Sequence, residues 1–134
     1  MAKYKPVEGL PEFQSSFWAD VSGIEVGSLT VQVDDDEWLI AFTFSPYQGL
    51  RLTTEDCFLW PEDVLYERPL FEMVDSPWIE ELKAGLKVND SSATFMDEAH
   101  HFLIPARQNV IEVVAWNVKW EITSLRSTPP TISR

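Results

Sequence analysis

The feature that most constrains the fold is a long run of alternating residues near the carboxyl end of the chain. From Val110 to Ile122 every second residue is apolar except Glu112, and such alternation is typical of a half-buried antiparallel strand. Up to Trp116 the intervening residues are largely apolar too, as in a strand that is covered on both faces. A strand of this length is unusual. We expect a bulge or a tight turn at Trp116 and Asn117, because asparagine tolerates left-handed backbone geometry.

The segment before this run predicts the partner strand of a hairpin. Residues 100–105 are rich in aromatic and branched side chains, and the polar stretch after them is short enough for a hairpin loop. A loop of two residues, 107–108, places Glu112 opposite Leu103. His101 then lies on the same face as Glu112, one diagonal step away, so the two side chains can touch.

Other segments predict further strands and one principal helix. Residues 27–53 resemble a meander of three antiparallel strands, with a polar tip after the first strand and turn residues at 45–49. Residues 70–74 predict another strand. Ser76 is a good N-cap before a proline, and it begins an apolar stripe that predicts a helix lying on the sheet. Gly85 lies where this helix could stop.

Together these segments predict an α+β fold: a largely antiparallel sheet of about six strands with one principal helix packed on it. We expect a single domain over residues 1–126 and a flexible tail over residues 127–134, which carry two consecutive prolines and little apolar mass. Short helical turns are expected around residues 13–18, 54–57 and 60–63.

The charge of the chain narrows the classes of partner. The sequence has 22 acidic and 10 basic residues, and residues 1–67 alone hold thirteen acids against three bases. A phosphate backbone or an anionic membrane requires a basic surface, so we expect neither nucleic acid nor membrane as a partner, and a basic protein remains. The acidity can equally serve solubility alone. With one cysteine, no apolar leader and no apolar run of membrane-spanning length, we expect a cytoplasmic protein.

No metal or cofactor is expected. His100 and His101 are neighbours, so on a strand they point to opposite faces and cannot share one ion with the nearby acids Asp97 and Glu98. The acids at residues 34–37 are consecutive, whereas calcium loops space their ligands. The five glycines form no phosphate-binding loop.

His101 and Glu112 are the leading candidates for acid–base chemistry, and Glu72 and Arg51 are further residues that could line a pocket. Glu112 has apolar neighbours, and burial there disfavours its charged form unless the carboxylate is paired. The alternative interpretation is structural: Glu112 pairs with Arg107, His101 or Arg51 and only sets the register of the strands.

The single cysteine and the tryptophans are expected to serve packing. Cys57 precedes two apolar residues, which predicts a buried and inert thiol. Trp60 lies in an irregular segment and is the tryptophan expected to be exposed. Four others fall on predicted core faces: Trp38, Trp78, Trp116 and Trp120.

We expect a non-catalytic interaction protein, immunity-like or inhibitor-like, for a basic partner. Its acidic hairpin tip is expected to project into water, so that replacing the acids costs little stability. The expected partner-binding residues are Asp34, Asp35, Asp36, Glu37 and Trp60. The alternative is a small enzyme or ligand-binding protein. Its expected pocket residues are His101, Glu112, Glu72 and Arg51.

Overall fold

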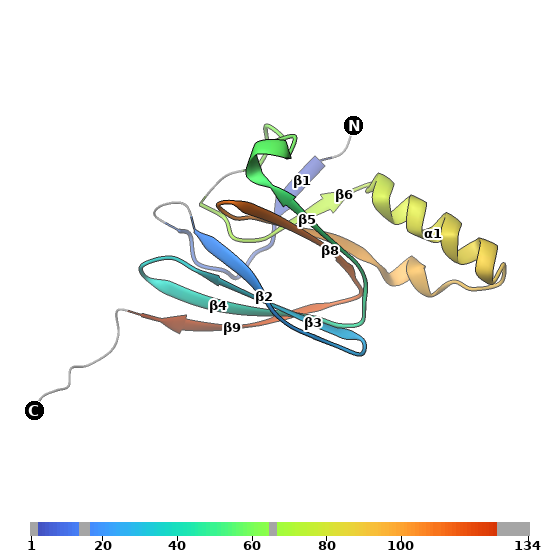
Figure 1. Cartoon of the computed structure of the whole chain (residues 1–134), viewed down its shortest axis with the longest axis horizontal. Coiled ribbons are helices and arrows are strands. Elements are labelled where there is room, and N and C mark those ends of the chain that lie inside the picture. The colour runs from blue at the N-terminus through green and yellow to red at the C-terminus, as the bar shows by residue number, and fades with distance from the viewer. Residues whose placement is uncertain (1–2, 14–16, 65–66, 126–134) are drawn as a thin grey trace, which may run out of the picture.

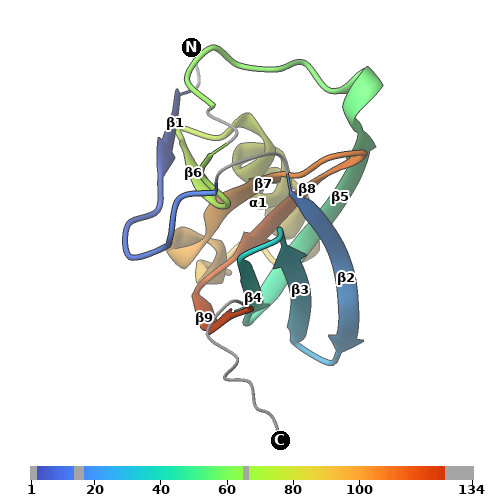
Figure 2. The same cartoon turned by 90° about the vertical axis from the view of Figure 1, so that its left-hand side faces the viewer.

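Two antiparallel sheets enclose the main apolar core in the computed structural model, which describes residues 3–13, 17–64 and 67–125 (Figures 1 and 2). Sheet A has the strand order β1-β6-β7-β8-β5, and sheet B has the order β2-β3-β4-β9. The strands are β1 (Lys3–Pro6), β2 (Trp18–Glu25), β3 (Ser28–Asp34), β4 (Trp38–Phe44), β5 (Tyr47–Thr54), β6 (Phe71–Val74), β7 (His100–Pro105), β8 (Asn109–Ala115) and β9 (Val118–Ser124). The helices are η1 (Glu55–Cys57), α1 (Pro77–Asn89) and η2 (Phe95–Glu98).

One bent pair of strands joins the two sheets. β4 passes into β5 through Ser45 and Pro46, and β8 passes into β9 through Trp116 and Asn117. The Ser45 N–H donates to the Asn117 carbonyl at 3.1 Å, and the Trp116 N–H donates to the Pro46 carbonyl at 3.0 Å. Pairing therefore continues through the bend. The interruption predicted at Trp116 and Asn117 is confirmed, and there the chain leaves sheet A for sheet B.

The bend changes which residues of the last long run face the core. Ile111 and Val113 of β8 lie in the core between the sheets, and Val118 and Trp120 of β9 pack against the same core. The alternation therefore shifts by one residue across the bend. The assignment of Trp116 to a core face is wrong, because the bend leaves this side chain 36% exposed.

Aromatic side chains fill the space between the sheets. Phe42 and Phe44 of β4 are fully buried, and the ring of Phe44 lies 5.5 Å from that of Phe102 on β7. Phe13 and Phe17 meet edge to face at 4.8 Å and pack into the same core. Apolar area removed from water is the main favourable term in such a core.

The mainly antiparallel α+β architecture is confirmed, but the expected number of strands is wrong: the described residues form nine strands in two sheets. Residues 45–49 do not turn the chain back on itself, and β5 pairs with β8 instead of β4. β1 and β2 were not predicted, because prolines and glycines interrupt the pattern around them. The tail predicted over residues 127–134 lies outside the described residues.

The short helical turns have different outcomes. The turn expected at residues 54–57 is present as η1. Residues 60–63 contain a turn but no helix. The helical turns expected over residues 13–18 are wrong where they can be tested: Trp18 begins a strand, and residues 14–16 lie outside the described part of the chain.

Helix α1 begins as predicted. The Ser76 hydroxyl oxygen accepts a hydrogen bond from the Ile79 N–H at 3.2 Å, and a proline occupies the first helical position. The helix does not stop at Gly85 but continues to Asn89, since an interior glycine weakens a helix by about 1 kcal/mol without ending it. No helix within the described residues is long and apolar enough to cross a membrane.

The acidic hairpin between β3 and β4 differs from expectation at one residue. Asp35 is buried, and its Oδ1 accepts hydrogen bonds from the Glu37 N–H at 2.7 Å and the Trp38 N–H at 2.8 Å. This carboxylate holds the turn together, whereas Asp36 is exposed. The expectation that every acid of the tip projects into water is therefore wrong for Asp35.

We predict that Asp35→Ala lowers the free energy of unfolding by about 1–3 kcal/mol, because two partly buried N–H groups lose a charged acceptor. Asp36→Ala, one residue away and exposed, should leave the urea midpoint nearly unchanged. Urea denaturation of both variants checks this. Equal midpoints for the two variants would contradict the assigned role of Asp35.

Candidate functional site

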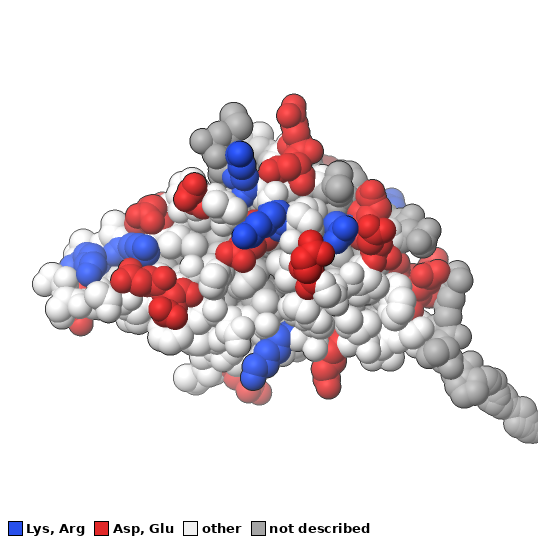
Figure 3. Space-filling view, turned by 180° about the vertical axis from the view of Figure 1, so that it is seen from behind, with Lys and Arg blue, Asp and Glu red and all other residues white. Residues whose placement is uncertain are grey.

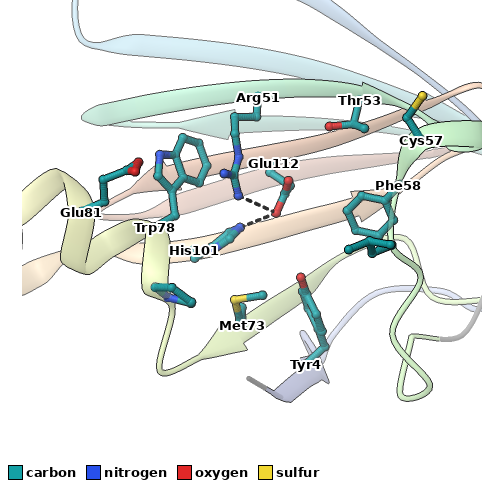
Figure 4. Close-up of a pocket in the computed structure, with 12 residues that line it drawn as sticks. Tyr4, Arg51, Thr53, Cys57, Phe58, Met73, Trp78, Glu81, His101 and Glu112 are labelled. Carbon is teal, nitrogen blue, oxygen red and sulfur yellow. Dashed lines mark hydrogen bonds and ion pairs between the residues drawn. The ribbon is translucent and has the colours of Figure 1, made fainter. Parts of the chain in front are cut away.

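The outer face of sheet A is covered at its two ends and open between them. At one end α1 packs Trp78 against Val114 of β8. At the other end residues 55–64 pack Phe58 and Trp60 beside Leu103. An open hollow of about 480 Å³ lies between, and we call it the cleft (Figure 4).

Three of the sequence-predicted residues meet at the floor of the cleft. The Nε2 atom of His101 lies 2.8 Å from Oε2 of Glu112, and Nη2 of Arg51 lies 3.4 Å from the same oxygen. They come from β7, β8 and β5, where Glu112 is paired with Leu103 on one side and with Arg51 on the other. The hairpin register expected from the sequence is present, and with it the contact between His101 and Glu112.

Glu72 does not join this group. Its Oε2 lies 2.7 Å from Nδ1 of His100, a residue on the opposite face of β7 from His101. On β6 it is the neighbouring residue, Met73, that lines the cleft. Strand alternation therefore sends Glu72 to the other side of the sheet.

The second ring nitrogen of His101 is bonded to the start of α1. Its Nδ1 lies 2.6 Å from the Ser76 hydroxyl oxygen, which also accepts the Ile79 N–H. An ionised Glu112 is an acceptor only, so Nε2 of His101 carries a proton and donates it. Nδ1 accepts the Ser76 hydroxyl hydrogen when the ring is neutral and donates to the Ser76 oxygen when the ring is charged. His101 is 1% exposed, and both of its nitrogens are bonded within the protein.

The Trp78 ring contacts both Arg51 and His101. The guanidinium carbon of Arg51 lies 4.0 Å from the centre of the Trp78 ring, within range of a cation–π interaction. The Trp78 ring also meets His101 edge to face at 5.2 Å. Gly49 makes this packing possible, because a β-carbon there would lie 2.8 Å from Cζ2 of Trp78.

Two ionisable groups of the cleft have shifted pKa values. Burial favours a higher pKa for Glu112, but the hydrogen bond and charge of His101 and the charge of Arg51 outweigh it, so the Glu112 pKa is lowered. Burial first, and then the negative charge of Glu112, raise the pKa of Tyr4 to about 12. The Tyr4 hydroxyl points into the cleft and stays protonated at neutral pH (Figure 4).

Two packing predictions for the segment after β5 are wrong. Cys57 is exposed and lines the cleft, since η1 turns it away from the core. Trp60 is partly buried: its Nε1–H donates to the Glu55 carbonyl at 3.2 Å and its ring packs edge to face on Phe58 at 5.0 Å. Trp18, at 44% exposure, is more exposed than Trp60.

Several residues that shape the cleft carry no sequence signal that links them to it. The pattern around Ser76 predicts a helix cap and that around Trp78 an apolar stripe, but neither indicates a contact with His101. Tyr4 belongs to a four-residue strand that left no periodic signal. Over the ranges that the structure describes, no three His, Cys, Asp or Glu side chains gather as a metal site would require.

No protein-family model, curated protein or solved structure matches this chain. The geometry of the cleft and the acidity of the chain are therefore the observations that bear on its function.

Because the Trp78 ring sits directly over Gly49, we predict that Gly49→Ala displaces it and lowers stability by about 1–3 kcal/mol. Gly85→Ala is the matched control: its new methyl group meets open space within α1, so it should raise stability by about 0.5–1 kcal/mol. Thermal unfolding of both variants measures the difference. An unchanged Gly49→Ala protein would show that Trp78 does not pack there.

The lowered Glu112 pKa predicts a dependence of stability on pH. The unfolded chain has the ordinary value of 4.5 and the folded state a lower one, so the stabilisation is complete above 4.5 and is lost as the pH falls through the folded-state value. Glu112→Gln should therefore be less stable than the parent at neutral pH. The difference in stability between the two proteins should shrink as the pH falls below 4.5 and through the folded-state pKa of Glu112. Urea midpoints across pH test this, with the exposed Glu121→Gln as control. A gap that is constant with pH would refute the ionic role of Glu112.

Proposed function

We propose that this protein is a non-catalytic interaction module that binds a basic protein partner. The observation that carries the proposal is the large excess of acidic side chains, a net charge of −12 on 134 residues. Since the chain has 22 acids and 10 Lys and Arg residues, most carboxylates cannot be matched one to one within the protein. A basic surface on another protein is the chemical complement of this charge.

The buried network supports binding over proton transfer. His101 is enclosed and uses both ring nitrogens, one on Glu112 and one on Ser76. Ser76 also serves as the N-cap of α1, so its oxygen is committed to the fold. A carboxyl with a lowered pKa is a weak base at neutral pH, which argues against Glu112 as a general base.

The hairpin tip between β3 and β4 is one region of negative potential, because several carboxylates lie close together there. The pKa of Asp34 is raised by its partial burial and then by the negative charges of Asp20 and Asp35. A cation brought close to these groups would relieve their mutual repulsion. On the face shown in Figure 3 acidic side chains also gather at several other places, with basic ones between them.

The cleft supports a second candidate, a protein that binds a small ligand. It is concave, partly aromatic and holds polar groups that converge on its floor, as ligand sites do. Of the four pocket residues expected from the sequence it contains His101, Glu112 and Arg51 but not Glu72. A ligand that raises the melting temperature, and whose effect is lost in Arg51→Ala, would favour this candidate.

The proposed function predicts an association rate that depends on salt. Proteins retained from a lysate of the native host are identified, purified and tested one by one with the pure module for reversible binding. The partner should have a basic isoelectric point. Association should slow when the Debye length falls from about 30 Å at 0.01 M salt to about 8 Å at 0.15 M.

The double variant Asp34→Asn with Asp36→Asn should slow association at low salt and match the parent at high salt, which makes high salt the internal control. Asp35 is left intact because it holds the turn. A partner that is acidic, or one whose association rate does not change with salt, would overturn the proposal.

A further inference from the structure

A second hollow adjoins the cleft and extends it into a groove. This hollow, of about 830 Å³, lies beside Trp60. Tyr4, Leu59 and Met73 line both hollows, so the two share a wall. We call the two together the groove. The two adjoining hollows can take successive side chains of one segment of chain.

The side chains of the groove combine apolar surface with negative charge. Leu59 is 92% exposed between the two hollows. Glu62 lines the Trp60 side and Glu81 of α1 lines the other, and both are exposed. Neither has an ion-pair partner within 4 Å among residues 3–13, 17–64 and 67–125.

The basic residues of the groove do not cancel this charge. Arg51 is held by Glu112 and by the Trp78 ring, and its charge is thereby matched locally. Lys3 is the other base of the lining, and across from it Asp63 accepts the Tyr4 N–H at 2.8 Å. The raised pKa of Tyr4 agrees, since Glu112 affects it more strongly than Arg51 does. The groove as a whole is therefore negative.

We infer that this groove is the docking site of the basic partner, which inserts a lysine or arginine from an extended segment beside Trp60 and Glu62. The inference rests on the proposed function and names the surface and the chemistry of recognition. The Glu62 carboxylate attracts the charged end of such a side chain, and Trp60, which lines the same hollow, offers apolar surface to its methylene groups. The apolar neighbours of that lysine or arginine in the partner pack on Leu59. The acidic hairpin tip then serves long-range attraction only.

An array of eight-residue peptides tests the inference. One half carries lysine or arginine at the centre with all other positions varied, and the other half carries glutamate or alanine there. Peptides with a basic centre and an adjacent leucine, isoleucine or aromatic residue should be enriched on the labelled protein. Titration of an enriched peptide into ¹⁵N-labelled protein should shift the indole N–H signals of Trp60 and Trp78 and leave that of Trp38 in place.

Substitutions distinguish binding in the groove from binding at the acidic hairpin tip between β3 and β4. Glu62→Lys with Glu81→Lys should weaken binding of the enriched peptides about tenfold or more, because like charges then meet the ligand. Leu59→Ser, which removes the apolar contact without adding charge, should weaken it too. All three residues are exposed, so urea midpoints should stay near that of the parent. Glu62→Lys and Glu81→Lys are also measured singly against Glu25→Lys, which makes the same change of charge on an exposed residue at the end of β2. Glu25→Lys should change binding less than about twofold.

Each remaining outcome has a defined meaning. If basic peptides bind but Asp34→Asn with Asp36→Asn abolishes binding and the groove variants do not, the groove is the wrong site and the proposed function stands. If the groove variants and Glu25→Lys weaken binding alike, the attraction is non-specific and the docking site is refuted. If no basic peptide is enriched over the acidic and neutral ones, docking of an extended basic segment is refuted, and the salt dependence of association with a basic protein still decides the proposed function.

Discussion

The structure depends on the bend that carries one pair of strands from sheet A into sheet B. Two backbone hydrogen bonds, from Ser45 to Asn117 and from Trp116 to Pro46, keep the pair together where its direction changes. Without the bend, β4–β5 and β8–β9 would form one long ribbon with no second layer to bury its apolar face. Because the two layers grow from one ribbon, their inner faces meet and the aromatic core between them closes.

The bend also affects the outer face of sheet A, because part of that face has to be covered. β8 is buried on both faces, since Ile111 and Val113 face the core while Val110 and Val114 are covered by loop and helix. The covering is incomplete, because α1 reaches one end of this face and residues 55–64 reach the other. Strand β8 places Glu112 between these two covered ends. A carboxylate that is removed from water needs partners, and His101 and Arg51 provide them.

This network connects the fold to the proposed function. His101 links the helix cap at Ser76 to Glu112 in the sheet, and Trp78 packs on both His101 and Arg51. The position of α1, and with it one wall of the cleft, therefore depends on polar contacts that are closed within the protein. A rigid wall favours binding, because less conformational entropy is lost when a partner docks. The groove presents acidic and apolar side chains on such a frame, and the proposed recognition of a basic segment depends on this arrangement.

The sequence by itself determined the elements whose signals are local. Alternation predicted β8 and β9 and the break between them, the short polar loop predicted the register that pairs Leu103 with Glu112, and Ser76 predicted the start of α1. The contact between His101 and Glu112 followed from that register alone. Only the tertiary structure decided that β5 leaves β4 and pairs with β8, since a turn-like sequence at residues 45–49 suits a hairpin and a corner equally well. It also decided that Glu72 points away from the cleft and that Tyr4 and Trp60 border one groove. These facts depend on contacts between residues far apart in the chain, and such contacts leave no periodic trace in a single sequence.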